Sequence, residues 1–318
     1  MLSRLVVSIF SAGLMGMVSG VACGQDFPSK PIRVVTTAAG GGSDFTVRII
    51  GPGISGPLGQ SVVVDNRSNG FIAAEFVAKA PPDGHTVLVT GGSLWILPLL
   101  RKTPYEVADF AAVSLLERSI NMVAVHPSVP VKSIKELIAF AKARPGQLNY
   151  SSDAIGGRAQ LATELFKSMA GVNMVQVTYK GNSPAITALI SGETQVMFTD
   201  VALLSPHVKA GRLRALAVTS LGPSTLAPGM PTVAESGLPG YESSGMTGMY
   251  APVKTPAVAL NRLSQELARF LSRTDIKERF LAAGVETVGS TPEEFAAIIK
   301  ADTTRAAKVI KDAGIKSE

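Results

Sequence analysis

The sequence predicts an α/β protein with two lobes, each a sheet covered by helices. Stretches typical of buried strands alternate with stretches typical of helices, and this order produces βαβ units and mostly parallel sheets. At 318 residues the chain is large for one such sheet. The C-terminal third is mostly helical and lacks strands of its own, so we expect its helices to pack back on the first lobe.

The first 24 residues are interpreted as a secretory signal peptide. Arg4 is their only charge, an apolar run of small residues follows it, and Ala22-Cys23-Gly24 places small residues at the cleavage site. The mature chain would begin at Gln25. Two alternatives stay open: a membrane anchor, for which the run is short, and a lipid attached to Cys23.

Composition excludes several classes of function. Cys23 is the only cysteine, so the mature chain would have no disulfide, no catalytic thiol and no cysteine-ligated metal. The net charge of +6 becomes +5 once Arg4 is removed with the leader. There is no run of Lys and Arg and aromatic residues are few, which is not the pattern of a nucleic-acid-binding protein. The mildly basic balance suits a small anionic ligand.

The first lobe is expected to begin with two strands joined by an unusual helix. The strands are residues 32–37 and 60–67, and between them "IIGPGISGPLG" carries three glycines and two prolines before its final glycine. An interior Pro costs a helix about 3 kcal/mol and a Gly about 1 kcal/mol, so we expect a short or kinked helix. A helix at 73–80 and a strand at 85–91 follow.

The second lobe continues the alternation. Ser133 and Glu136 form a capping box for a helix at 134–144, and Ser183 with Pro184 is expected to cap a helix at 185–191. The other expected elements are strands at 147–152, 173–180, 194–200 and 213–220, a helix at 158–170, and C-terminal helices that begin at Thr255-Pro256 and Thr291-Pro292.

The triple glycine Gly40–Gly42 lies where the first strand turns into a helix, the place where α/β folds bind ligands. Glycine allows a ligand to approach the backbone, and a helix N-terminus favours an anion. We expect the N–H groups of Gly41, Gly42 and Ser43 to be the donors. Phe45 breaks the dinucleotide fingerprint, and the Gly-Lys pair of a phosphate loop is absent. The alternative, a turn that only connects strand to helix, stays open.

Two more strand-to-helix turns share this chemistry, "SSDAIGGRAQL" at 151–161 and "YKGNSP" at 179–184. If the three turns converge, they form a cleft lined by backbone donors. The histidines are widely spaced, and we expect each to be a surface or loop residue; they are His85, His126 and His207. No metal site and no catalytic set is expected.

Several segments, in order, carry a resemblance to a known family: "FPSKPIRVV", "AAEFVAKAPPDGHTVLV", "LATELFKSMAG", "YKGNSPAITALISGETQVMF" and "MPTVAESGLPGYE". From about Asp26 to the C-terminus the chain resembles the solute-binding proteins of the tripartite tricarboxylate transporter (Bug-type) family. The resemblance implies a type 2-like periplasmic binding protein with two α/β lobes joined by crossover strands and a ligand cleft between them. It implies a monomer in the periplasm, with no cofactor, no metal and no nucleic-acid partner.

The resemblance also implies a division of the chain. After the signal peptide at 1–24, lobe 1 would comprise residues 25–125 and 248–318, and lobe 2 residues 126–247. The crossovers would lie near "NMVAVHP" and "SSGMTGMYAP" and act as a hinge that closes on the ligand.

By this resemblance the protein is a receptor, not an enzyme, for a small carboxylate or related polar metabolite. It would pass the ligand to membrane transporter subunits or report it to a sensor protein. Alternatives are an exported hydrolase or lyase on the same fold, and a scaffold without a ligand. The expected ligand-binding residues are Ala39, Gly40, Gly41, Gly42, Ser43, Asp44, Ser93, Ser152, Gly156, Gly157, Arg158, Tyr179, Lys180, Gly181, Asn182 and Asp200.

The chain departs from the family pattern at its ligand loops. Thr37 and Ala39 replace a usual Phe and Pro, Arg158 stands where a small hydroxylated residue is usual, and Gln160 replaces a His. A cation in the first turn of a helix opposes the helix dipole. We therefore expect Arg158 to reach into the cleft and pair with a second carboxylate or sulfonate of the ligand. A solvated arginine that points away from the cleft is the alternative.

Overall fold

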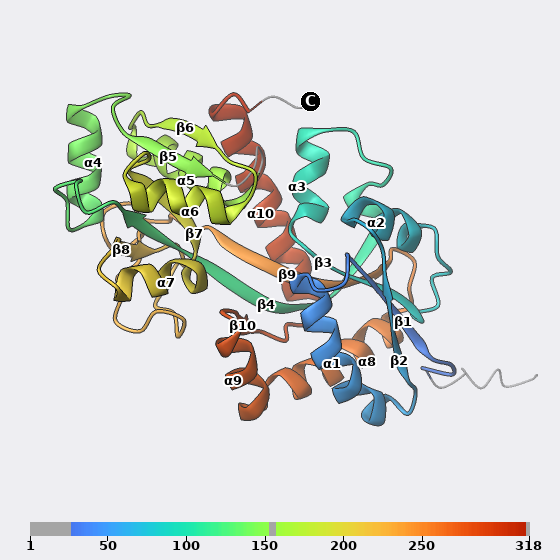
Figure 1. Cartoon of the computed structure of the whole chain (residues 1–318). Coiled ribbons are helices and arrows are strands. Elements are labelled where there is room, and N and C mark those ends of the chain that lie inside the picture. The colour runs from blue at the N-terminus through green and yellow to red at the C-terminus, as the bar shows by residue number, and fades with distance from the viewer. Residues whose placement is uncertain (1–26, 153–156, 316–318) are drawn as a thin grey trace, which may run out of the picture.

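The computed structural model describes residues 27–152 and 157–315. The predicted signal peptide and Gly156 lie outside these described residues. Within them, ten strands form one mixed sheet in the order β2-β1-β3-β9-β4-β7-β5-β6, and β8 and β10 also pair with β4. Helices surround the sheet (Figure 1). The predicted α/β class is confirmed.

The strands are β1 (Ile32–Thr36), β2 (Val62–Asn66), β3 (Thr86–Gly91), β4 (Phe110–Val125), β5 (Asn149–Ser152), β6 (Val175–Thr178), β7 (Val196–Asp200), β8 (Arg214–Val218), β9 (Ser244–Pro252) and β10 (Glu286–Thr287). The helices are α1 (Gly42–Leu58), α2 (Gly70–Ala78), α3 (Ser93–Leu100), α4 (Ile134–Ala143), α5 (Arg158–Ala170), α6 (Asn182–Ser191), α7 (Val201–Lys209), α8 (Ala257–Leu271), α9 (Thr274–Ala282) and α10 (Pro292–Asp312), with a short 3-10 turn at Val107–Asp109.

The outer strands are parallel and the central ones antiparallel. β1 pairs in parallel with β2 and β3, and β5 does so with β6 and β7. β4 pairs antiparallel with β9 along Phe110–Ile120 and with β7 along Asn121–Val125. β4 therefore runs through both halves of the sheet, and Figure 1 shows it beside β9 between them. The exact lobe boundaries stay a prediction.

Of the expected short or kinked helix, the short form is wrong, because α1 runs for 17 residues despite Pro52 and Pro57. Its glycines allow close packing. A Cβ at Gly53 would overlap the ring of Phe270 on α8, and one at Gly51 would lie 3.3 Å from Val62 of β2. Burial of Ile50 and the other apolar residues of α1 offsets the low helix propensity, since most helical stability in proteins comes from tertiary packing.

The helix starts were predicted with mixed success. Ser133 accepts a hydrogen bond from the Glu136 N–H at 3.2 Å, as expected for the cap of α4. The expected cap at Ser183 is wrong, because α6 begins at Asn182 with Gly181 as its N-cap. Gly181 adopts a φ of 104°, a conformation that favours glycine, and this turns the chain into the helix earlier than the Ser-Pro pair indicated.

Helix α10 packs against both halves of the sheet rather than the first alone, because it contacts α3, β4 and α5. Its Asp302 accepts a hydrogen bond from the indole N–H of Trp95 on α3 at 2.7 Å. Its Arg305 donates to Glu242, just before β9, at 3.0 Å. The helices of the described residues include none with the length and apolar character needed to cross a membrane.

Gly248 on β9 provides a test of this packing. It lies between β3 and β4, and a Cβ there would overlap the ring of the fully buried Phe295. We expect Gly248→Ala to lower the free energy of unfolding by roughly 1–3 kcal/mol, as overpacking does. Gly56→Ala, at an exposed position of α1 with open space around it, should instead raise the free energy of unfolding by up to about 1 kcal/mol. Urea unfolding measures the free energy of unfolding of both variants. Equal values for Gly248→Ala and Gly56→Ala would contradict the packing described.

Candidate functional site

An open cleft of about 1160 Å³ lies above the middle of the sheet. Its lining comes from elements far apart in the sequence. Gly42 and Ser43 come from the start of α1, Ser93 from the start of α3, and Glu117 and Ser119 from β4; Arg158 begins α5, Asp200 ends β7, and Gly245 lies on β9. Two of the three predicted loops thus reach this cavity, together with the two central strands.

The glycine loop presents the N-terminus of α1 to the cleft. Gly41 is the N-cap, and its carbonyl accepts the first helical hydrogen bond, from the Phe45 N–H at 2.9 Å. The Gly41 N–H donates to the Ala38 carbonyl at 3.3 Å. The first turn leaves the N–H groups of Gly42, Ser43 and Asp44 without helical partners. Of the three expected donors, the Gly41 N–H is thus used inside the loop, whereas Gly42 and Ser43 line the cleft.

Asp44 braces this loop from within. Its buried carboxylate accepts hydrogen bonds from the Gly40 N–H at 2.8 Å, from Arg48 Nε at 2.9 Å and from Asn66 Nδ2 at 2.8 Å. The hydrogen bond from Arg48, helped by those from Gly40 and Asn66, outweighs burial and lowers the pKa of Asp44 to about 2. These oxygens bind the protein itself, so the role that the geometry supports for Asp44 is to hold the glycine loop in place.

Arg158 is the cation of the cleft, and it is already paired. Its side chain is 48% exposed. Nη2 donates to both carboxylate oxygens of Asp200 at 2.9 Å, and Nη1 donates to Ser119 Oγ at 2.6 Å. A Cβ at Gly245 would collide with this guanidinium, so the space that Arg158 occupies depends on a glycine in β9. A glycine inside a strand often marks such a close approach.

Glu117 is a functional candidate that the sequence analysis missed. It is buried on β4, lines the cleft and accepts a hydrogen bond from Thr46 Oγ1 at 2.7 Å. Burial raises the pKa of its carboxyl, while hydrogen bonds from Thr46 and Thr247 and the charge of Arg158 act in the opposite direction. The signal in the sequence was a charged pair, Glu117-Arg118, inside a mostly apolar run. A charge in such a run is notable because a buried charge needs a specific partner.

The predicted site residues divide into two groups. Gly42, Ser43, Ser93, Arg158 and Asp200 line the cleft. The predicted residues that the structure describes and that do not line this cavity are Ala39, Gly40, Gly41, Asp44, Ser152, Gly157, Tyr179, Lys180, Gly181 and Asn182.

Some of this second group bind other parts of the protein. The Tyr179 hydroxyl donates to Glu193 at 2.8 Å, and Ser152 Oγ accepts from Gln176 at 2.8 Å. Asn182 Oδ1 accepts from Thr199 Oγ1 at 3.3 Å. Ligand contacts by residues 179–182 therefore stay a prediction, as do those of Gly156, outside the described residues.

The cleft is suited to holding a polar anion by backbone N–H groups, because its side-chain charges are largely matched. Arg158 faces Asp200, and Glu117 is buried and hydrogen-bonded. Within residues 27–152 and 157–315, no cluster of three or more His, Cys, Asp or Glu side chains is arranged to hold a metal ion.

The hydrogen bonds that Asp44 accepts from Gly40, Arg48 and Asn66, which we call the Asp44 brace, predict a pH dependence of stability. The folded-state pKa of about 2 lies below the ordinary value of 3.8, so the stabilisation is present above about pH 4 and lost as the pH falls toward 2. Asp44→Asn should lower the free energy of unfolding at pH 7 by roughly 1–3 kcal/mol. The gap between the native protein and the variant should shrink between pH 4 and 2 in urea titrations.

Asp275→Asn is the matched control, because Asp275 pairs with Arg273 on the exposed surface at the start of α9. Exposed ion pairs contribute little to stability. A gap for Asp44→Asn that stays constant from pH 7 to 2 would contradict the brace.

Comparisons with known proteins agree with this geometry. The family model described as "Tripartite tricarboxylate transporter family receptor" matches residues 46–315. Protein BugT of Bordetella pertussis is 32% identical over 320 residues, which cover 98% of this chain and 97% of BugT.

Two solved structures extend the comparison. Rpa4515 of R. palustris, solved with adipate, is 35% identical with a TM-score of 0.72, covering 92% of this chain and 99% of that one. MatC of Rhodopseudomonas palustris, solved with bound malate, is 26% identical with a TM-score of 0.66, covering 89% of this chain and all of that one. The fold is the two-lobed fold of periplasmic binding proteins, and the chain belongs to the tripartite tricarboxylate transporter family of receptors, the TctC or Bug-type solute-binding proteins.

Proposed function

We propose that this chain is a periplasmic receptor that binds a small carboxylate in the cleft. It would deliver that ligand to a tripartite tricarboxylate-type transporter or report it to a sensor protein. The observation that carries the proposal is the N-terminus of α1, where Gly42 and Ser43 line the cleft and their N–H groups have no helical partner. Such a helix N-terminus is a ready-made site for an anion.

The choice of a carboxylate rests on two further points. The related structures were solved with adipate and with malate, which are both dicarboxylates. In this chain the Arg158–Asp200 pair leaves the cleft without an unpaired cationic side chain among its lining residues, so backbone donors would do most of the binding. Closure of lobe 2 (126–247) on lobe 1 (25–125 and 248–318) is part of the proposal, with β4 and β9 as crossovers.

Substitution of Gly42 tests the anion site. A Cβ at this position meets no atom within 4 Å, so Gly42→Val should leave the fold intact while its side chain covers the N–H groups. We expect its affinity for the best-bound carboxylate to fall at least about tenfold, roughly 1.4 kcal/mol. Titration calorimetry with malate, adipate and shorter dicarboxylates measures this loss, and the melting temperature reports on the fold.

Gly56→Val is the control, since Gly56 is an exposed glycine of the same helix and also has open space around it. Unchanged affinity in Gly42→Val would show that the glycine loop is only a connector. Chemical conversion of a bound carboxylate, detected by mass spectrometry, would favour the exported hydrolase or lyase. A protein that no carboxylate stabilises would favour the scaffold without a ligand.

Arg158 is proposed to bind a second anionic group of the ligand. Its guanidinium lines the cleft, but Asp200 already accepts two hydrogen bonds from it. A second carboxylate must therefore either share the Arg158 guanidinium with Asp200 or displace Asp200 from it. Arginine binds carboxylates through a planar fork of donors, so such an exchange preserves the type of contact.

Adipate and hexanoate, which have the same number of carbons, test the role of Arg158. Arg158→Ser should cost adipate roughly 1.5–3 kcal/mol of binding free energy, as for hydrogen bonds to charged groups, and cost hexanoate little. Asp200→Asn should strengthen the binding of adipate, because it frees the guanidinium. Equal losses for the two acids in Arg158→Ser, or none, would remove Arg158 from the ligand site.

A further inference from the structure

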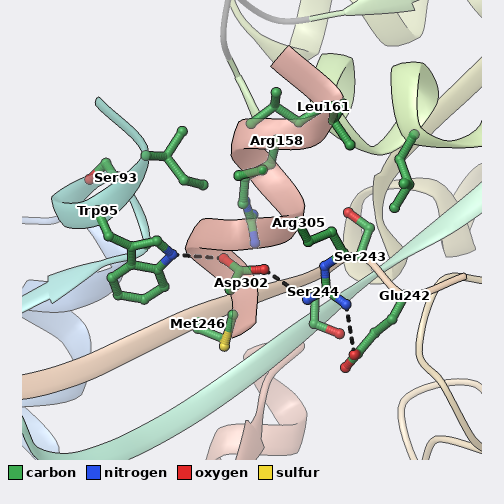
Figure 2. A pocket seen from close by; sticks show the side chains of 15 residues that line it. Ser93, Trp95, Arg158, Leu161, Glu242, Ser243, Ser244, Met246, Asp302 and Arg305 are labelled. Atoms are coloured by element: carbon green, nitrogen blue, oxygen red, sulfur yellow. Dashed lines mark hydrogen bonds and ion pairs between the residues drawn. The ribbon is translucent and has the colours of Figure 1, made fainter. Parts of the chain in front are cut away.

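A second cavity adjoins the cleft, and no comparison assigns it a role. Its volume is about 600 Å³ including its mouth, and we call it the annex. Its walls are the start of α3, the inner faces of α5 and α10, and the beginning of β9 (Figure 2). The annex and the cleft share four lining residues, which are Gly92, Ser93, Arg158 and Met246. The two cavities therefore lie next to each other, and Arg158 belongs to the lining of both.

The charged groups in the annex bind one another. Asp302 accepts from the Trp95 indole N–H at 2.7 Å and from Arg305 at 2.8 Å. Arg305 also donates to Glu242 at 3.0 Å, so the chain of contacts in Figure 2 runs from α3 through α10 to the start of β9. Arg158, at the mouth, is paired with Asp200. A further charged group that entered the annex would have to break these pairs.

The rest of the annex is mainly apolar. Leu161 and Leu165 of α5 line it, and so do Ala306 and Val309 of α10. Met246, Ile96 and the Trp95 ring complete the apolar lining. Ligand pockets of this kind, mostly apolar with a few fixed polar groups, bind the hydrocarbon part of a molecule. Burial of an aromatic ring or alkyl group here would remove apolar surface from water.

We propose that the annex binds the apolar body of the ligand, an aromatic ring or branched alkyl group attached to the carboxylate at α1. This inference rests on the proposed function and names the class of carboxylate that the receptor prefers. It does not depend on whether Arg158 binds a second anionic group, because it concerns the part of the ligand that extends past that side chain. The physical contrast is between a cleft that offers hydrogen-bond donors and an annex that offers apolar surface and matched charges.

The probe is a pair of acids that differ only in the apolar body, 3-phenylpropionate and propionate. Calorimetry uses the full mature chain, freed of any co-purified ligand by unfolding and refolding. We expect 3-phenylpropionate to bind at least about tenfold more tightly than propionate. If propionate binds too weakly for direct titration, competition titrations give an upper limit on its affinity. That ratio corresponds to about 1.4 kcal/mol.

Two variants alter the annex in opposite ways. Ala306→Phe fills it from α10, and Leu161→Ser makes its α5 wall polar. Each should lower the affinity for 3-phenylpropionate at least about fivefold and change that for propionate less than about twofold. The matched controls are Ala301→Phe and Met169→Ser, at exposed positions of the same two helices outside the annex. Both controls should bind like the native protein.

The outcomes separate the inference from the proposed function. If 3-phenylpropionate binds no more tightly than propionate, or if folded Ala306→Phe and Leu161→Ser bind it like the native protein, the annex is not a ligand site. In that case malate or adipate can still bind, and the receptor stands. If the native protein binds none of these carboxylates, the proposed function itself fails. Equal losses for both acids in the annex variants would also overturn the inference, because they indicate a general distortion.

Discussion

The pairing of β4 with strands from both halves of the sheet is the constraint on which the site depends. Because this one strand is hydrogen-bonded to β9 and β10 at one end and to β7 and β8 at the other, it connects the two halves of the sheet. The cleft lies over that junction, with Glu117 and Ser119 of β4 in its lining. Gly245 on the neighbouring β9 provides the space in which Arg158 reaches Ser119. A side chain at that position of β9 would close the centre of the cleft.

The electrostatics of the cleft follow from pairing rather than from net charge. The chain carries an excess of basic residues, yet the cation in the cleft is matched by Asp200, and Asp44 behind the glycine loop is matched by Arg48. Burial raises the pKa of Glu117, while hydrogen bonds from Thr46 and Thr247 and the charge of Arg158 act in the opposite direction. With Arg158 paired to Asp200, the attraction that we propose for an anion is the partial positive charge at the start of α1. In the annex, Arg305 donates to both Glu242 and Asp302, so each of these charged groups has a hydrogen-bond partner among the walls, which are otherwise mainly apolar.

Local signals in the sequence predicted the outer strands, most of the helices between them and the position of Gly42 and Ser43 beside the cleft. Interactions between distant residues were not predictable. The 17-residue α1 depends on a close approach to Phe270, more than 200 residues away, so its prolines and glycines were misleading. Only the end of β4 was predicted, as the crossover near "NMVAVHP". The charged Glu117 in its first half finds its partner, Thr46, on α1, and the sequence alone does not show that contact. Arg158 was identified as unusual, but its pairing with Asp200 and Ser119 depends on how β4, β7 and α5 meet in three dimensions. The loop at 179–182 had the right composition, yet Tyr179 binds Glu193.

Native mass spectrometry of the gently isolated protein tests the central claim, that the cleft holds a small carboxylate without changing it. The account predicts a noncovalent complex whose extra mass is that of one carboxylic acid, released intact on denaturation. It also predicts that Gly42→Val, purified in parallel, emerges largely empty while Gly56→Val retains the ligand, because only Gly42 lines the cleft. A native protein that carries no small molecule and takes up none when incubated with carboxylates, or one that releases a chemically altered product, would contradict the account.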